Sequence, residues 1–324
     1  MNESWRPTAS LENLRRRAEI LSSVRRFFSE RGVLEVETPQ LSAAAITDPN
    51  IESLAVAYDG PGAPADRRLW LQTSPEYAMK RLLAAGIGSI YQICHAFRAG
   101  ERGRRHNPEF TLVEWYRVGF DHHRLMDEVA ELVSGVLGER PQERLSYRDA
   151  FLRYAGLDPW RTGIGELKEC AIRHGIPLPP LDDDALDPWL DLLLSEVVSP
   201  RLGRDCYSFV FDFPPTQAAL AQLRERDGRL AGERFELFID GLEIANGYHE
   251  LADPLEQERR FAAERERRQR AGQPVGEIDS RLLAALAAGL PACAGVALGF
   301  DRLVMLAVNA ERIDEVIAFP VERS

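Results

Sequence analysis

The segment from Phe97 to Arg117, FRAGERGRRHNPEFTLVEWYR, constrains the fold more than any other part of this chain. It predicts two β-strands joined by a basic loop, the first covering 89–97. Because alternate residues of a strand point to the same side, the second strand places four residues on one face: Phe110, Leu112, Glu114 and Tyr116. A ring, a carboxylate and a phenol on one face indicate a ligand-binding surface, with Arg98 at the strand end available for a phosphate.

The charge balance limits the classes of partner. Lysine and arginine total 40 of the 324 residues and aspartate and glutamate 51, which gives a net charge of −11. Such a chain is poorly suited to a broad nucleic-acid surface, which needs clustered cations. A local basic patch remains at Arg98, Arg102, Arg104 and Arg105. Its position between two strands favours triphosphate binding over the alternative of a solvated loop.

The cysteines indicate a reducing compartment. Cys94, Cys170, Cys206 and Cys293 lie far apart, and the absence of a CxxC pair argues against a zinc site and a disulfide framework. The N-terminus has no apolar segment typical of a signal peptide, so we expect a cytoplasmic protein.

One uncharged stretch, Leu282–Phe300, has the length of a membrane span. Gly289-Leu290-Pro291 interrupts it, and Asp279 and Ser280 before it are typical of a helix cap. We therefore expect a short buried helix, a turn and a core strand there, and no membrane association.

The remaining pattern predicts an α+β fold, with a mainly antiparallel sheet surrounded by helices, in one domain covering 1–324. Apolar residues at helical spacing predict a helix that ends at Gly32, followed by a strand over 33–38. Ser74-Pro75-Glu76 predicts a helix start, with Ser74 as the N-cap and Pro75 in the first turn. Further expected elements are a helix over 121–138, a helical insertion over 144–215, a hairpin of 235–239 and 242–248 around Asp240-Gly241, and a solvated helix over 257–270.

Five ordered segments resemble class II aminoacyl-tRNA synthetases of the lysyl branch. The segments 14–39, 97–117 and 295–306 resemble motifs 1, 2 and 3, while 73–82 and 243–251 resemble the lysine pocket. The resemblance implies that ATP activates a carboxylate as an acyl-adenylate, which needs positioning and positive charge but no enzyme nucleophile. It also implies a homodimer through motif 1, although an ordinary core helix explains that pattern equally well.

The resemblance assigns an ATP site in which Arg98 and Arg302 are catalytic. Arg98 meets the α-phosphate, Phe110 stacks on adenine, Arg302 lies on the other side of the nucleotide, and Glu243 holds Mg²⁺. The complete expected set is Arg98, Gly100, His106, Asn107, Phe110, Glu243, Ile244, Gly299 and Arg302. Alone, Phe110 and Gly299 would indicate only core packing and a turn.

The resemblance also assigns an amino-acid pocket. Its expected residues are Ser74, Pro75, Glu76, Tyr116, Asn246, Glu250 and Ala297. Glu76 meets the amine near the carboxylate, while Tyr116 and Glu250 bind the distant ammonium. Glu243 and Asn246 lie three residues apart, on opposite faces of a regular strand, so we expect a β-bulge if both serve the site.

Two departures from the synthetases point to a smaller family. The chain offers no place for an N-terminal OB-fold that binds the anticodon, and Ala297 stands where the synthetases usually have glycine. Both features resemble the elongation factor P (R)-β-lysine ligases. That resemblance implies transfer of (R)-β-lysine to a lysine of elongation factor P, with no stable tRNA binding.

A third departure leaves adenine recognition open. Motif 2 has Phe97-Arg98-Ala99-Gly100 where the family often has F-R-N-E, so either Glu101 or the backbone of Gly100 replaces the missing glutamate. Two other functions remain as alternatives. One is a truncated synthetase or amide synthetase for α-lysine. The other is a non-catalytic regulator, against which the retention of Arg98, Glu243 and Arg302 argues.

Overall fold

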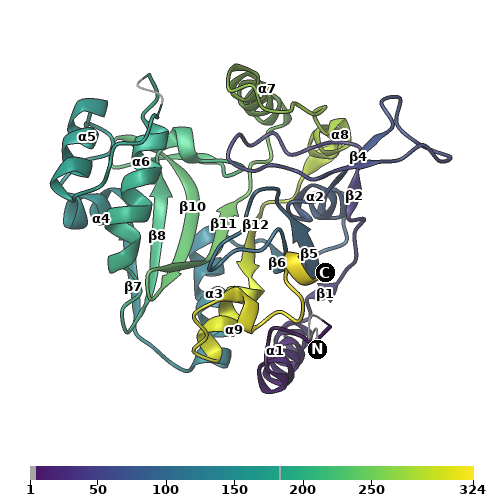
Figure 1. Cartoon of the computed structure of the whole chain (residues 1–324). Coiled ribbons are helices and arrows are strands. Elements are labelled where there is room, and N and C mark those ends of the chain that lie inside the picture. Colours follow the sequence, from purple (N-terminus) through teal and green to yellow (C-terminus); the bar gives the residue numbers. More distant parts are fainter. Residues whose placement is uncertain (1–4, 182–183) are drawn as a thin grey trace.

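A mostly antiparallel sheet forms the centre of the computed structural model, which describes residues 5–181 and 184–324 (Figure 1). Its strands are β1 (Leu34–Glu35), β5 (Ile90–Phe97), β6 (Glu109–Val118), β7 (Gln142–Ser146), β8 (Tyr207–Phe213), β9 (Leu223–Arg226), β10 (Arg229–Ile239), β11 (Leu242–His249) and β12 (Cys293–Gly299). Their order is β1-β5-β6-β12-β11-β10-β8-β7, and β9 pairs with β10. Only the β1–β5 and β7–β8 pairs of the described sheet are parallel. A smaller sheet has the order β2-β4-β3, with β2 (Leu41–Ser42), β3 (Ala55–Ala57) and β4 (Arg68–Leu71).

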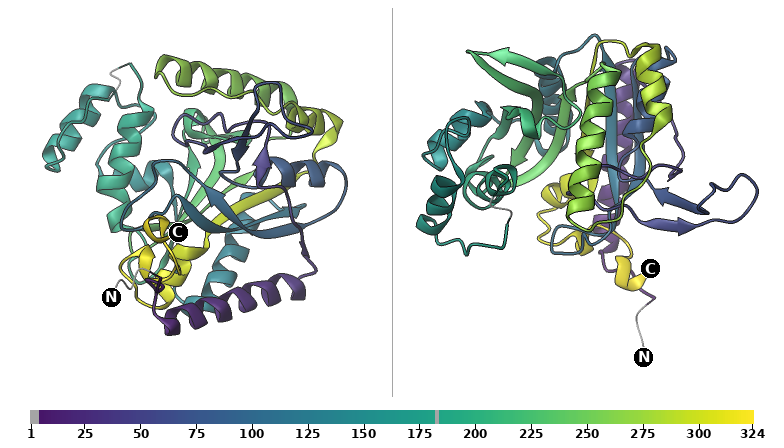
Figure 2. Two further views of the ribbon diagram at one scale, coloured as in Figure 1. Left: turned by 45° about the vertical axis from the view of Figure 1, so that its right-hand side comes forward. Right: turned by 90° about the horizontal axis from the view of Figure 1, so that it is seen from above.

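Helices surround this sheet, which confirms the α+β prediction. They are α1 (Leu11–Glu30), α2 (Glu76–Ala84), α3 (His122–Leu137), α4 (Tyr147–Tyr154), α5 (Ile164–Arg173), α6 (Asp187–Leu193), α7 (Pro254–Arg270), α8 (Ser280–Gly289) and α9 (Phe300–Ala307). In Figures 1 and 2, α4, α5 and α6 lie beyond β8, while α7 and α8 lie together at the opposite side from α1 and α9.

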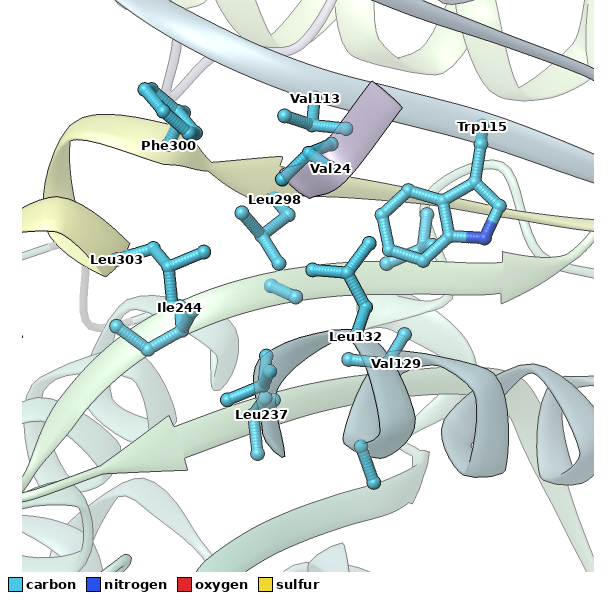
Figure 3. Close-up of a cluster of buried hydrophobic side chains, with 14 of the residues drawn as sticks. Val24, Val113, Trp115, Val129, Leu132, Leu237, Ile244, Leu298, Phe300 and Leu303 are labelled. Atoms are coloured by element: carbon cyan, nitrogen blue, oxygen red, sulfur yellow. The ribbon is translucent and has the colours of Figure 1, made fainter. Parts of the chain in front are cut away.

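The main core lies between the sheet and the helices α1, α3 and α9. Figure 3 shows Val113 and Trp115 of β6 in this cluster, together with Val24 of α1 and with Val129 and Leu132 of α3. Since strand side chains alternate, Leu112, Glu114 and Tyr116 of the same strand are directed to the other face. The core helices thereby hold the strands that present the ligand-binding face.

The hairpins follow the predicted pattern. β5 and β6 pair antiparallel from Ile90↔Tyr116 to Phe97↔Glu109. β10 and β11 join through Asp240 and Gly241, with φ of 51° and 73°, values that glycine and aspartate tolerate better than most residues. The prediction for 282–300 is also confirmed, since α8 begins after the Asp279 cap and β12 follows a turn. Within residues 5–181 and 184–324, no helix has the length and hydropathy needed to cross a bilayer.

Several expected boundaries were wrong. The strand predicted over 33–38 shrinks to β1, because the chain leaves the sheet after one further backbone bond, from Val36 to Tyr91. The range 144–215 contains α4, α5 and α6 but also most of β7 and all of β8, which belong to the main sheet.

The expectation of a solvated α7 was also incomplete. Phe261 is buried, and Arg268 donates to the carbonyl oxygens of Asp48 and Ile51 at 2.6 and 2.8 Å. One face of α7 therefore packs against the 48–51 loop. Residues 1–4 and 182–183 lie outside the described chain. They include the start of the N-terminal segment and part of the Pro/Asp-rich stretch 177–188.

Candidate active site

A cleft of about 970 Å³ opens on the sheet face away from α3. The predicted site residues that line it are Ser74, Glu76, Arg98, His106, Asn107, Phe110, Tyr116, Glu243, Ile244, Asn246, Glu250, Ala297, Gly299 and Arg302. Pro75 and Gly100 do not belong to its described lining. Glu101 does, with its carboxylate 3.7 Å from Arg98, so the geometry favours Glu101 over Gly100 as the replacement for the motif 2 glutamate.

Arg302 organises one end of the cleft. Its Nη1 donates to the carbonyl oxygen of Glu243 at 2.8 Å, and its Nη2 lies 2.6 Å from Nε2 of His106. Burial, and next the charge of Arg302, lower the pKa of His106, so a neutral ring accepts this hydrogen bond near pH 7. Across the cleft, the Arg98 guanidinium lies 5.0 Å from the centre of the Phe110 ring. Both guanidinium groups therefore line the same cleft.

An ion-pair network holds this end in place. Arg17 of α1 contacts Asp301 at 2.5 Å and donates to Thr111 Oγ1 at 2.8 Å. The other carboxylate oxygen of Asp301 accepts the Thr111 amide at 2.7 Å. Asp301 is buried, and an ion pair with this many hydrogen bonds is well compensated for desolvation. The segments that resemble the three motifs are thus joined directly at the residue before Arg302.

The basic patch is smaller than predicted. Arg102 pairs with Asp314 and Glu322, and Arg104 pairs with Glu311, all outside the cleft lining. Only Arg98 and Arg105 of the four arginines line the cleft. The sequence spacing could not distinguish them, because the loop turns at Gly103↔His106 and sends alternate arginines towards the C-terminal segment.

Lys80 lies behind two residues that line the other end of the cleft, and it is the main residue that the sequence analysis missed. Its Nζ lies 2.7 Å from Glu76 and 2.6 Å from Glu250, and its side chain is 1% exposed. Burial alone would lower the pKa of Lys80, but the two carboxylates outweigh burial and hold it above its usual value. The four-residue spacing of Glu76 and Lys80 at a predicted helix start was the available signal.

Glu114 completes this end of the cleft. Its two carboxylate oxygens accept from Ser74 at 2.7 Å and from Tyr116 at 2.8 Å. Burial, and next repulsion from Glu76, raise the pKa of Glu114 to about 8. Burial likewise raises the pKa of Glu250 to about 7, although Lys80 opposes this effect.

One local prediction changes, and another stays a prediction. Tyr116 donates to Glu114 and lies beside Glu250 at Gly295, so the expected binding of the distant ammonium by Tyr116 and Glu250 is still a prediction. Ser74 is not the N-cap of α2, because Pro75 occupies that position. The Ser74 hydroxyl still accepts the Glu76 amide at 3.0 Å, while its proton is directed to Glu114.

The predicted bulge is present. Leu237 pairs with Ala245 but Phe238 pairs with Glu243, so Ile244 is the extra residue. Its side chain packs in the core (Figure 3), and both Glu243 and Asn246 line the cleft. Oδ1 of Asn246 is buried and has no hydrogen-bond partner in the described chain. Because such atoms are costly, it is a candidate acceptor for a substrate amine.

Gly295 permits this packing, and Gly295→Ala should therefore damage the site. A Cβ there would lie 2.2 Å from Cε1 of Tyr116 and 2.5 Å from Oε1 of Glu250. We expect a loss of about 1–3 kcal/mol in unfolding free energy and a higher KM for the amino acid. Urea unfolding and steady-state kinetics measure both. Gly135→Ala in α3, where a Cβ meets no atom within 4 Å, is the matched control and should change neither the unfolding free energy nor the KM.

Comparisons with known proteins agree with this geometry. The profile of the family described as tRNA synthetases class II (D, K and N) matches residues 4–323. The chain is 50% identical over 321 residues to the elongation factor P–(R)-β-lysine ligase of Pectobacterium carotovorum subsp. carotovorum, covering 99% of this chain and 98% of that protein. The ligases of Pasteurella multocida and Vibrio vulnificus are each 49% identical, with 99% of both chains covered.

The chain belongs to the elongation factor P–(R)-β-lysine ligase family. This family lies within the class II synthetases, which use ATP to activate amino acids. The predicted resemblance is therefore confirmed. The roles of the individual site residues remain predictions, supported by the positions of these residues around one cleft.

Proposed function

We propose that this chain activates (R)-β-lysine with ATP and transfers it to the ε-amine of a lysine on elongation factor P. A carboxylate oxygen of the amino acid attacks the α-phosphorus, and pyrophosphate leaves. The acceptor amine then attacks the carbonyl carbon, loses a proton and displaces AMP. The observation that carries the proposal is the division of one cleft into a carboxylate-rich end, with Glu76, Glu114 and Glu250, and an end flanked by Arg98 and Arg302.

The charges of the amino-acid end fit a diamino acid. This end holds three carboxylates, at Glu76, Glu114 and Glu250, and one buried ammonium, at Lys80, which pairs with Glu76 and Glu250, so full ionisation leaves 3 − 1 = 2 negative charges. β-Lysine brings two ammonium groups. Its binding would favour ionisation of the carboxyls whose pKa values burial raises, because a buried charge is tolerated once it is paired. A side chain without the second cation would leave a buried charge unpaired and is rejected.

Ala297 supports selection of the β-isomer. In the register of the sheet, it pairs with Glu114 of β6 on one side and with Asn246 of β11 on the other. Its methyl group therefore stands between two polar side chains of the pocket floor. A substrate amine placed one carbon farther from the carboxylate avoids the space that this methyl group fills.

At the nucleotide end, Arg98 and Arg302 stabilise the charge that develops on the phosphates, and Phe110 supports the adenine. The residues present also fit Mg²⁺, since the partly exposed carboxylate of Glu243 faces the cleft 3.9 Å from Arg302. Mg²⁺ typically combines one or two carboxylates with phosphate oxygens and water, and there it would neutralise phosphate charge.

We also propose a homodimer through the segment 14–39, in which Leu34 is exposed and which Leu11 and Leu41, also exposed, flank. A protein acceptor used in translation places the reaction in the cytoplasm and requires no stable tRNA binding.

Mass spectrometry of elongation factor P tests the proposal. The factor is incubated with this protein, ATP, Mg²⁺ and either (R)-β-lysine or α-lysine. We expect one added β-lysyl group, dependent on ATP, and a clear preference for the β-isomer. Preference for α-lysine would favour the truncated synthetase, and absence of AMP formation with either amino acid would favour the non-catalytic regulator.

Glu250→Gln tests the amino-acid end. The amide keeps the size of the side chain but loses the charge-assisted contact, which is worth about 1.5–3 kcal/mol, so kcat/KM for (R)-β-lysine should fall about 10- to 100-fold. ATP–pyrophosphate exchange measures the change. Glu258→Gln on the exposed side of α7 is the control. Equal kcat/KM values for Glu250→Gln and the unchanged protein would remove Glu250 from the site.

A further inference from the structure

A second cluster of ligating side chains lies outside the described lining of the cleft. It consists of His122, the first residue of α3, Glu233 in β10 and His249, the last residue of β11, whose ligating atoms lie within 4.8 Å of one another. His122 is 0% exposed and Glu233 1%. The three residues come from distant parts of the chain and are brought together by the β10–β11 hairpin and the start of α3. Reasoning from cysteine pairs could not find them.

His122 is the unusual member of this cluster. Both of its ring nitrogens are buried, and neither has a hydrogen-bond partner in the described chain. A buried imidazole normally satisfies at least one nitrogen. The nearest acid is Asp212, whose Oδ1 lies 3.7 Å from Nε2 of His122 and is itself without a hydrogen bond. Plain core packing does not account for this arrangement, because an apolar side chain would fill the same space without leaving polar atoms unpaired.

The surroundings of Glu233 resemble those of a metal ligand. Its Oε1 forms an ion pair with Nε of Arg224 at 3.0 Å and accepts a hydrogen bond from Arg226 at 3.3 Å. Its Oε2 lies 2.6 Å from Nδ1 of His249 and accepts from Nε2 of Gln222 at 2.6 Å, so a bound ion would displace the Gln222 amide, which also contacts His249 Nδ1. Metal-binding carboxylates commonly use one oxygen for the ion and the other for an outer hydrogen bond, and metal-binding histidines commonly have a carboxylate such as Asp212 close by.

We propose that His122, Glu233 and His249 bind one divalent transition metal ion, with Zn²⁺ as the best match. Two imidazoles and one carboxylate form a set that Zn²⁺ accepts, and imidazole disfavours Mg²⁺ and Ca²⁺. The ion would tie the start of α3 to β10 and β11, next to Glu250 of the amino-acid pocket. The competing explanation is a metal-free hydrogen-bonded cluster of His249, Glu233 and Gln222, with Arg224 and Arg226 balancing the charge of Glu233.

Zinc binding by the untagged full-length protein separates these explanations. The protein is treated with a chelator, dialysed against Zn²⁺ with Mg²⁺ in excess, and analysed for metal content. We expect one Zn²⁺ per chain and a melting temperature that rises with Zn²⁺ concentration. Co²⁺ should give the visible absorption of a four-coordinate site without thiolate bands, which excludes binding through Cys206. A protein that retains no Zn²⁺ and melts at the same temperature with and without it overturns the proposal.

Variants assign the ion to these residues. His122→Phe and His249→Gln should weaken Zn²⁺ binding at least tenfold. The control His174→Phe, at an exposed helix end, should bind as the unchanged protein does. If His122→Phe fails to fold, His122→Gln gives the same comparison. Undiminished Zn²⁺ binding by the folded His122 and His249 variants would place the ion elsewhere and also overturn the proposal.

Discussion

Replacing Arg98 by alanine should lower the rate of adenylate formation about 10²- to 10³-fold, equivalent to about 2.7–4 kcal/mol of transition-state stabilisation. Arg98 directly follows β5, lines the cleft and lies over Phe110, so its guanidinium can stabilise the phosphate charge that develops as the bond to pyrophosphate breaks. The loss should appear in kcat more than in the KM for (R)-β-lysine, because the amino-acid end keeps its contacts. Single-turnover formation of the adenylate and ATP–pyrophosphate exchange measure it.

Arg104→Ala is the matched control for this experiment. Arg104 belongs to the same basic loop, but its guanidinium pairs with Glu311 at the surface. Exposed ion pairs contribute little, so both rate and stability should stay close to those of the unchanged protein. If Arg98→Ala and Arg104→Ala behaved alike, the phosphate contact assigned to Arg98 would be wrong.

Local chemistry explains why so much of this fold was predictable from sequence. The Asp240-Gly241 turn, the Asp279 cap and the alternation in β6 are each encoded within a few residues, and each is present. The bulge at Ile244 was predictable because two side chains three residues apart were both required on one face. Predictions failed where a distant segment decides the outcome. The β1 strand is short because only Leu34 and Glu35 pair with β5. Arg102 and Arg104 do not line the cleft, because they form ion pairs with acidic residues near the C-terminus.

The site shows the same division between local and distant information. Phe110, Glu114 and Tyr116 could be placed on one face from their spacing alone, but the second hydrogen bond of Glu114 and the repulsion that raises its pKa come from Ser74 and Glu76 of another segment. The role of Lys80 depends on its ion pair with Glu250, a residue that is far from Lys80 in the sequence. The His122 cluster likewise combines three segments, none of which carries a metal motif.

The largest expected stability effect is that of Lys80→Met. The chain contains only two lysines, Lys80 and Lys168, so nearly all of its 40 basic residues are arginines. The lysine at position 80 is the buried one, where a compact ammonium fits between Glu76 and Glu250 and a planar guanidinium would need more space. Removing one member of a buried ion pair leaves uncompensated charge, and we expect a loss of about 3–5 kcal/mol in unfolding free energy at neutral pH.

The pH dependence of this loss distinguishes lost charge from lost packing. Burial raises the folded-state pKa values of Glu114 and Glu250 to about 8 and about 7. A carboxyl whose pKa is raised on folding binds more protons when folded, so its contribution to stability falls as pH rises from the unfolded pKa towards the folded one. Without Lys80, stability should fall more steeply with rising pH. The difference in unfolding free energy between Lys80→Met and the unchanged protein should therefore be small near about pH 5 and largest near about pH 8. Urea unfolding at both pH values measures the difference, with Lys168→Met, whose ammonium lies over the Trp189 ring, as the control. A loss of the same size at both pH values would mean that Lys80 acts through packing alone.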